Sequence, residues 1–263
     1  MIFEEWHYDS VIKSRILPSR LSVNEELAYK TLEPILQSWA GDYLLGINIS
    51  GSRAKGTATN LTSDMDLFIS LSSNTPITLK EIYNSCYNCL RENINNVRKQ
   101  NVSIGVTMNF FGGDCISIDV VPAKRQSQYG NDHSLYKNKY DTWVKTNIDT
   151  HINQVVNSGR QFDIVALKIW RDLNKIDFPS IYLECFSLEY LRGKPLAHCT
   201  SNFYHLLNSI ALNIEEKTIY DPANSNNILS NELTKTEKTK LARYARPVSY
   251  THLRAHETKA HLV

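Results

Sequence analysis

The chain has 263 residues, enough for one large domain or two small ones. Its composition, 42% hydrophobic and 21% charged, is that of an ordinary globular protein and argues against disorder. The net charge of +2 is only slightly basic, whereas proteins that live on nucleic acid usually carry a clustered excess of Lys and Arg. A long RNA or DNA partner is therefore not indicated by charge.

The sequence favours a soluble protein of the reducing cytoplasm that has no membrane association. Its five cysteines are an odd number and are scattered along the chain. It shows no signal peptide at its start, and no apolar run approaches the roughly 18 residues of a membrane span. Cys86 and Cys89 form a lone C-x-x-C inside a predicted helix, which favours buried structural thiols over zinc ligands.

The first predicted elements are a helix and a strand. Apolar residues recur at helical spacing over residues 22–39, behind a Ser22…Glu25 capping box, and Pro34 disturbs this helix slightly. Alternating apolar residues predict a strand over residues 43–50. The segment GSRAKGTATNLTS that follows is rich in Gly, Ser and Thr and is predicted to be a loop.

Strict alternation resumes in DMDLFISLS and predicts a second strand over residues 64–72. Residues 79–98 have a helical period. Two further strands are predicted over residues 102–110 and 115–121, joined as a hairpin at the paired glycines of FFGGDC.

Beyond Pro122 the periodicity becomes helical, notably over residues 158–174 and 180–193 and after Ser201 and Thr234. The prediction is a sheet domain followed by a mostly helical one.

The predicted domains are a sheet domain with a bracing helix over residues 1–125 and a helical domain over residues 126–246. The remaining residues, 247–263, are predicted to be a non-native tail. The tail packs three of the eight histidines into PVSYTHLRAHETKAHLV without periodicity and resembles a translated sequencing adapter. Its histidines are therefore not interpreted as a metal site, and the natural chain is expected to continue differently after residue 246.

Two carboxylates, Asp64 and Asp66, project from the same face of their predicted strand, because side chains alternate along a strand. The apolar residues between and after them take the core face. Like charges this close raise each other's pKa unless a cation compensates, so the pair predicts a Mg²⁺ site. The alternative is a strand edge that carries solvated acids.

A third carboxylate, Asp119, lies opposite the apolar residues of CISIDVVP. If its strand lies beside the strand of Asp64 and Asp66, the three carboxylates converge. Three carboxylates suit two divalent ions, Mg²⁺ or Mn²⁺. We therefore predict that all three are metal ligands and catalytic residues, and that Asp119 also accepts the proton of the attacking hydroxyl.

A phosphate-binding turn is predicted at Gly51-Ser52, where a strand end offers backbone N–H groups and a hydroxyl. Arg53 and Lys55 in the same loop are candidates for phosphate contacts, although solvated loop charges are the commoner outcome. A Gly-Ser pair alone is a weak signal, because most such pairs are simply turns.

Together, G-S-x-x-x-G-T, D-x-D on an alternating strand and a later strand aspartate resemble the DNA polymerase beta-like nucleotidyltransferases. The helical half resembles the group of oligoadenylate synthetase, archaeal CCA-adding enzyme and the bacterial cGAS/DncV-like (CD-NTase) second-messenger synthases. The resembling segments are IDVVPAKRQ, WVKTNIDTHINQVVNSGR, IVALKIWRDLNKIDFPSIYLE and DPANSNNIL. The resemblance covers most of residues 18–245 and implies an α/β (α+β) fold: a polymerase beta-like mixed-sheet nucleotidyltransferase domain plus a helical domain, bilobal with a central cleft.

The resemblance also implies that Lys168, in the helix of VALKIW, and Ser180, before the following helix, bind the nucleotide through its triphosphate. The alternatives are a surface pair between Lys168 and Asp172 and an N-cap role for Ser180 after Pro179. Tyr182 stands one residue after the position where the family commonly stacks the base, and a core role is an alternative there.

Asp221 and Asn227 in DPANSNN resemble a turn that borders the cleft in this family, and an Asx turn explains the pattern equally well. His133 has no partner spacing that indicates catalysis.

The resemblance implies an NTP-dependent nucleotidyltransferase that releases pyrophosphate. The weak charge and the helical half favour a second nucleotide as acceptor, giving a cyclic or linear oligonucleotide second messenger of the antiviral signalling type. The alternative is addition to an RNA 3′ end, as in CCA- or poly(A)-adding enzymes. A non-catalytic nucleotide-binding or antitoxin-like module is a further alternative, against which the intact aspartates argue.

Overall fold

The structure is a computed structural model that describes residues 2–18, 20–61 and 64–246. The predicted non-native tail, residues 247–263, lies outside the described residues. The chain divides into two compact units. The sheet unit comprises the described residues of Pro18–Ala58 and Ser63–Asn153. The helical unit comprises those of Met1–Leu17, Thr59–Thr62 and Gln154–Val263.

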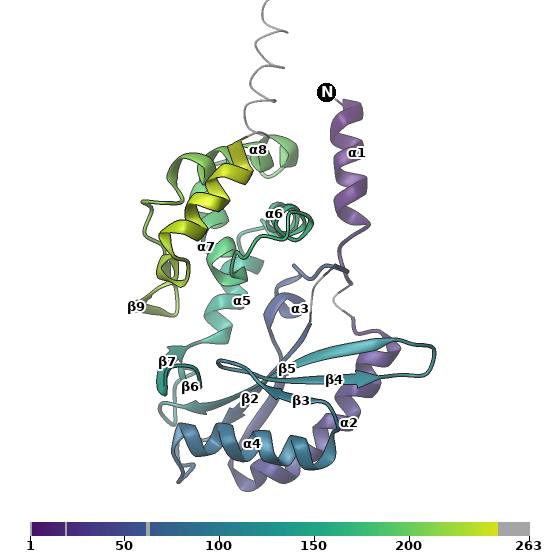
Figure 1. Ribbon diagram of the computed structural model, residues 1–263, viewed down its shortest axis with the longest axis vertical. Helices are drawn as coiled ribbons and strands as arrows, with labels where there is room; N and C mark the ends of the chain where they lie inside the picture. Colours follow the sequence, from purple (N-terminus) through teal and green to yellow (C-terminus); the bar gives the residue numbers. More distant parts are fainter. Residues whose placement is uncertain (1, 19, 62–63, 247–263) are drawn as a thin grey trace, which may run out of the picture. The chain divides into compact units, whose positions relative to one another are not determined.

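The sheet unit is built on a mixed seven-stranded sheet, drawn in Figure 1. Its path runs β1-β2-β5-β4-β3, with β6 pairing to β5 and β7 to β6. The β2–β5 pair is parallel and the other pairs are antiparallel. The four predicted strands and the predicted hairpin are confirmed. The strands are β1 (Leu44–Ile49), β2 (Met65–Leu71), β3 (Val97–Lys99), β4 (Ile104–Asn109), β5 (Cys115–Arg125), β6 (His133–Lys137) and β7 (Thr142–Thr146).

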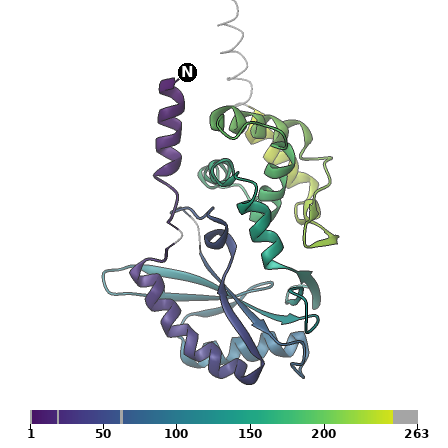
Figure 2. The same cartoon turned by 180° about the vertical axis from the view of Figure 1, so that it is seen from behind.

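Two helices, α2 (Val23–Ala40) and α4 (Leu79–Asn93), pack together against one face of this sheet (Figures 1 and 2). The capping box of α2 forms as predicted: the Ser22 N–H donates to Glu25 at 2.8 Å, and the Glu25 N–H donates to the Ser22 hydroxyl at 3.3 Å. The helix continues through Pro34. Alternate strand residues supply the core beneath the two helices, including Met65, Leu67, Ile69, Ile104, Val106, Ile118 and Val120. Cys86 is buried in this core and Cys89 is partly buried, and both thiols are free.

Two local predictions in this unit are wrong. The helix predicted over residues 79–98 ends at Asn93, because the chain becomes extended at Ile94 and β3 then pairs with β4. The loop predicted after β1 begins with a short helix, α3 (Gly51–Lys55), which Gly56 ends in a left-handed conformation at φ 68°. In both places pairing or turn geometry outweighed the local composition.

The β6–β7 hairpin is absent from the prediction and explains why the sheet unit extends past residue 125. His133, the first residue of β6, is 4% exposed and pairs with both neighbouring strands, β5 and β7. Its Nδ1 is 2.8 Å from the carbonyl oxygen of Asn131 and its Nε2 is 2.8 Å from the Ser70 hydroxyl. Because a carbonyl only accepts, Nδ1 carries the proton and Nε2 accepts from Ser70 in the neutral ring.

Acidification should destabilise the protein through His133. Burial lowers the pKa of His133 and Arg125 lowers it further, against the opposing effects of the Asn131 carbonyl, Asp149 and Asp132. The unfolded chain therefore takes up the proton first, and stability is lost as the pH falls below about 6.5. Between about pH 7.5 and about pH 5.5, we expect wild-type protein to lose roughly 2–4 °C more in Tm than the His133→Gln variant. Equal losses in thermal melts of both proteins would contradict this assignment.

The helical unit contains the predicted helices over residues 158–174 and 180–193, observed as α6 (Gln161–Leu173) and α7 (Ser180–Tyr190). Its other elements are α1 (Ile2–Lys13), the C-terminal part of α5 (Ile148–Val156), α8 (Cys199–Asn213), the hairpin of β8 (Tyr220–Asp221) and β9 (Asn224–Ile228), and a helix over residues 235–246. The segment before Leu17 groups with this unit, since α1 packs on α6 and α8. It was predicted to belong to the sheet domain.

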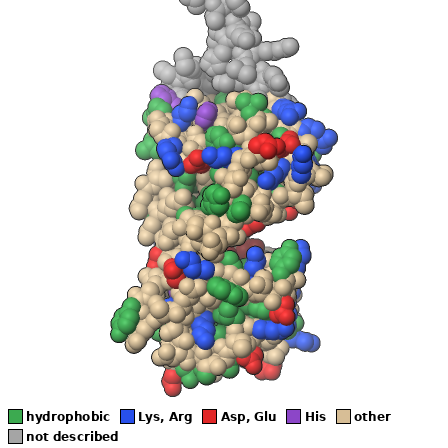
Figure 3. Space-filling view, turned by 90° about the vertical axis from the view of Figure 1, so that its left-hand side faces the viewer, with side chains coloured by type: hydrophobic (Ala, Val, Ile, Leu, Met, Phe, Trp, Pro, Cys, Tyr) green, Lys and Arg blue, Asp and Glu red, His purple; other side chains and the backbone are tan. Residues whose placement is uncertain are grey.

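Surface charge is mixed in sign. On the face drawn in Figure 3, Lys and Arg side chains are interspersed with Asp and Glu and form no continuous basic surface. Within the described ranges, no helix is both long and apolar enough to cross a bilayer.

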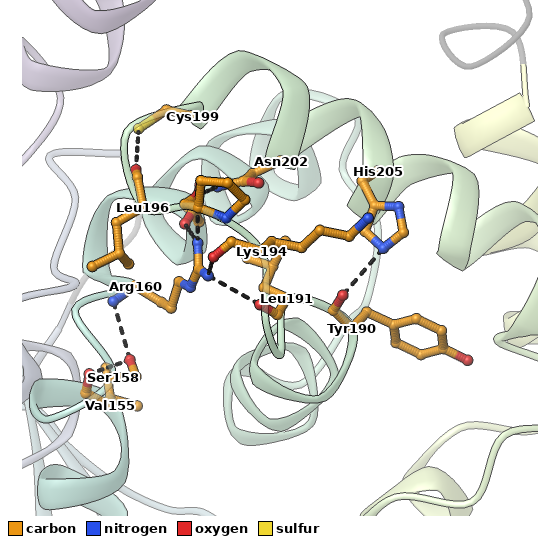
Figure 4. Close-up of polar contacts among 12 residues, drawn as sticks. Val155, Ser158, Arg160, Tyr190, Leu191, Lys194, Leu196, Cys199, Asn202 and His205 are labelled. Atoms are coloured by element: carbon orange, nitrogen blue, oxygen red, sulfur yellow. Dashed lines mark hydrogen bonds and ion pairs between the residues drawn. The ribbon is translucent and has the colours of Figure 1, made fainter.

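Arg160 fastens the loop between α7 and α8 (Figure 4). Its guanidinium donates to the carbonyl oxygens of Leu191 at 3.0 Å and Pro195 at 3.2 Å, and to that of Lys194. It also pairs with the buried Asp163 at 3.2 Å. These charge-assisted hydrogen bonds tie the loop to Arg160, the residue that precedes α6.

Candidate active site

Two of the three predicted aspartates, Asp66 and Asp119, lie side by side on one face of the sheet unit. β2 and β5 are neighbours, and their parallel register places Asp66 directly opposite Asp119. Paired residues project from the same face, and here it is the face turned away from α2 and α4, because Met65 and Ile118 occupy the other. The adjacency on which the sequence prediction depended is therefore present.

Asp64, two residues before Asp66, belongs to the same electrostatic cluster. Burial raises the pKa of Asp119, and the negative charge of Asp64 raises it further, while Gln100, Ser103 and Arg98 act in the opposite direction. Partial desolvation also raises the pKa of Asp64, against the lowering effect of Arg98. Carboxylates that repel one another on a partly buried face are a setting that a cation would stabilise.

Gly51 packs directly against the Asp66 carboxylate. A Cβ atom at position 51 would lie 1.7 Å from Asp66 Oδ2 and 2.4 Å from its Cγ, and Gly51 has φ +58°. The Ser50 N–H donates to the Asp66 carbonyl oxygen at 2.9 Å, which fixes this approach. The turn and the aspartate therefore form one unit, and only glycine fits at this point.

Ser52 is the second residue of α3 and is partly exposed beside this cluster. The expectation that Arg53 is a solvated loop charge is wrong. Arg53 is buried, pairs with Glu25 at the start of α2 and donates to the Pro18 carbonyl oxygen at 2.7 Å. Lys55 is buried as well, at 8% exposure.

The β3–β4 hairpin contributes residues that the sequence did not single out. The Ser103 hydroxyl lies 3.3 Å from Asp119 Oδ2 and also contacts the Gln100 amide oxygen. The buried Tyr83 of α4 anchors the turn, since its single hydroxyl proton is shared between the carbonyl oxygens of Gln100 and Ser103, at 2.8 Å and 3.0 Å. Gly105 inside a strand pattern was the available signal, because such a glycine often marks a close approach.

The donor chemistry of the cluster fits a hard divalent cation, which prefers carboxylate oxygens. Because position 51 is a glycine, the Asp66 carboxylate fits against the turn. A side chain at position 51 would overlap this carboxylate. Across residues 2–18, 20–61 and 64–246, no three His, Cys, Asp or Glu side chains are already arranged to hold a metal ion. Metal binding by Asp64, Asp66 and Asp119 therefore stays a prediction.

Lys168 and Ser180 lie in the helical unit, on α6 and at the first residue of α7. Lys168 is 3% exposed and donates to the buried Glu184 of α7 at 2.7 Å. The Ser180 hydroxyl accepts from Arg171 at 3.0 Å and does not act as the N-cap, a position that Pro179 occupies. Nucleotide binding by Lys168 and Ser180 stays a prediction.

The two remaining candidates in this unit have structural roles. Tyr182 is 0% exposed and packs edge-on against Phe178 and Phe186 in the core. Asp221 forms the Asx turn, accepting from the Ala223 N–H at 2.8 Å and from the Asn227 amide at 3.0 Å.

No protein-family profile matches this sequence, and no curated protein is detectably similar to it. Solved structures do match it. The CD-NTase CdnG of Bradyrhizobium diazoefficiens, solved with GTP, matches with a TM-score of 0.76 and 12% identity, over 95% of this chain and 90% of that one. CdnC of E. coli MS115-1, solved with ATP, matches with a TM-score of 0.68 and 20% identity, over 84% of this chain and 82% of that one.

The CdnE cyclic dinucleotide synthase of Elizabethkingia meningoseptica, solved with GTP and Apcpp, matches with a TM-score of 0.64 and 16% identity, over 83% of this chain and 89% of that one. These similarities show that the chain has the CD-NTase fold. They confirm the predicted fold class of a mixed-sheet part and a helical part.

Proposed function

We propose that this chain, with its CD-NTase fold, is a nucleotidyltransferase that joins the nucleoside monophosphate of an NTP to a hydroxyl of a second nucleotide. The product is a cyclic or linear oligonucleotide that acts as a second messenger, and pyrophosphate is released. We place the enzyme in the cytoplasm and its signal in antiviral defence. The observation that carries the proposal is the register of β2 and β5, which sets Asp66 beside Asp119.

The proposed step forms a bond from the acceptor hydroxyl oxygen to the α-phosphorus and breaks the bond from that phosphorus to the leaving pyrophosphate. Asp119 takes the hydroxyl proton. Gly51 and Ser52 present backbone N–H groups and a hydroxyl to the triphosphate.

Asp64, Asp66 and Asp119 are the residues that would hold two Mg²⁺ or Mn²⁺ ions. What bound ions supply in such a site is neutralisation of the triphosphate charge and a lower pKa for the attacking hydroxyl. Lys168 and Ser180 complete the proposal as triphosphate ligands, on the strength of the resemblance of their segments.

A nucleotide acceptor is favoured by three observations. The net charge is only +2, and the face shown in Figure 3 carries no continuous basic surface of the kind that tracks a nucleic-acid backbone. The neighbours from E. coli and B. diazoefficiens were solved with ATP and GTP. A nucleotide acceptor therefore fits the charge of this chain better than an RNA end does.

The test is incubation of the purified chain with Mg²⁺ or Mn²⁺ and each labelled NTP, singly and in pairs, with and without RNA. Pyrophosphate release is measured, and the products are separated by chromatography and identified by their masses. The expected result is oligonucleotide product without RNA, absent from the Asp64→Ala/Asp66→Ala double variant.

Three results would contradict the proposal in different ways. Equal amounts of product from the double variant and the wild type would show that Asp64 and Asp66 are not catalytic residues. Products that appear only on added RNA would establish the RNA 3′-end alternative. A folded protein that releases no pyrophosphate from any NTP would indicate the non-catalytic module.

A further inference from the structure

One row of residues crosses four strands on the face of the aspartate cluster. The strand registers pair Arg98 with Gly105, Gly105 with Asp119, and Asp119 with Asp66. Paired residues project from the same face, and side chains directly opposite one another in antiparallel strands lie within about 5 Å. The row therefore places a cation and two carboxylates in line, with a glycine between them.

The side chains of Arg98 and Gln100 lie over Gly105, in the space that a side chain at this position would fill. A Cβ atom at position 105 would lie 2.9 Å from Arg98 Nε, 3.1 Å from Arg98 Cγ and 2.8 Å from the Gln100 amide nitrogen. The Arg98 side chain thus extends over Gly105 toward Asp119. A larger residue at position 105 would occupy that path.

We propose that Arg98 is the internal counter-ion of the three aspartates: its guanidinium neutralises part of their charge in the metal-free protein and competes with divalent cations for them. This inference rests on the metal site of the proposed function.

The charges around Arg98 agree with this role. Both Asp64 and Asp119 lie within electrostatic reach of the Arg98 guanidinium. The next residue, Lys99, points to the other face, where its ammonium lies 4.9 Å from the ring centre of Tyr87 and 2.6 Å from the Asn84 amide oxygen. The two adjacent cations of β3 thus lie on opposite faces of the sheet. Of these two, Arg98 is the one on the face of the aspartates.

The test measures Mn²⁺ binding by calorimetry and by the electron paramagnetic resonance signal of free Mn²⁺, without nucleotide. Removing a positive charge from the site should strengthen binding of a divalent cation. We expect Arg98→Met to bind Mn²⁺ about three- to tenfold more tightly than wild type at low ionic strength, and the difference to shrink as salt screens it.

Three variants serve as controls. Lys99→Met removes one charge from the opposite face and should leave Mn²⁺ affinity within about twofold of wild type. Gly105→Ala keeps the arginine but obstructs its path and should tighten Mn²⁺ binding in the same direction as Arg98→Met. Asp66→Asn should weaken it.

Unchanged or weaker Mn²⁺ binding by Arg98→Met would overturn the inference, as would an equal gain in Lys99→Met. An unchanged affinity in Asp66→Asn would overturn it too, by placing the ion elsewhere. The expected affinities together with no pyrophosphate release from any NTP would support the counter-ion role and contradict the proposed function instead.

Discussion

Alanine at Gly51 should reduce NTP-dependent pyrophosphate release by about 100-fold or more. The added Cβ would lie 1.7 Å from Asp66 Oδ2, so the carboxylate must move. Asp66 cannot retreat with its strand, since β2 is held between β1 and β5. The positive φ of +58° adds about 1 kcal/mol of strain in the folded state. Pyrophosphate release at saturating NTP and a thermal melt, measured on the same preparation, separate the two effects.

The matched control is Gly46→Ala, on β1 before the turn. The three atoms nearest to a Cβ there all belong to the Asn48 side chain, at 3.3 Å or more, so activity should stay close to that of wild type. Asp66→Asn should lose at least as much activity as Gly51→Ala while remaining folded. Full activity in Gly51→Ala would show that the position of Asp66 is unimportant for turnover.

Removal of the Lys168 charge should lower the free energy of unfolding by about 3–5 kcal/mol. Lys168 and Glu184 are each about 3% exposed at the side chain and lie 2.7 Å apart, between α6 and α7. Lys168→Met leaves Glu184 buried without this counter-charge, and that desolvation cost falls on the folded state. Denaturant unfolding measures the loss.

The Lys168→Met/Glu184→Leu double variant should recover much of that stability, because an apolar pair of similar volume avoids the desolvation cost. A double variant as unstable as the sum of the single variants would contradict the coupling. The same proteins test the nucleotide role of Lys168. If it binds triphosphate, the double variant should regain stability but keep a raised KM for NTP.

The strands that carry the aspartates could be predicted because strand periodicity is local. Alternation of apolar residues places Asp64 and Asp66 on one face without any knowledge of the fold. The meeting with Asp119 could not be derived in this way, because strand adjacency is decided by pairing between segments far apart in sequence. The family resemblance predicted the fold class, and the strand register in the structure showed that β2 and β5 are neighbours.

The remaining differences have the same origin. Strand β3 has three residues, too few for periodicity to reveal, and it is held by its pairing with β4. Arg98 was therefore assigned to a helix, and its place in the same row as Asp119, across Gly105, was missed. Arg53 stands in a polar loop by composition, yet the partner that buries it, Glu25, is supplied by a helix much earlier in the chain.

The parallel pairing of β2 with β5 has a consequence for biosynthesis. The two strands of a parallel pair cannot be joined by a tight turn, and here the crossover runs through α4, β3 and β4 before β5 returns to β2. Contacts between such distant segments form slowly, because a long loop must close first. A nascent chain that has not yet extruded β5 therefore holds Asp66 without Asp119, and during translation any ability to turn over NTP must wait for the sheet to close.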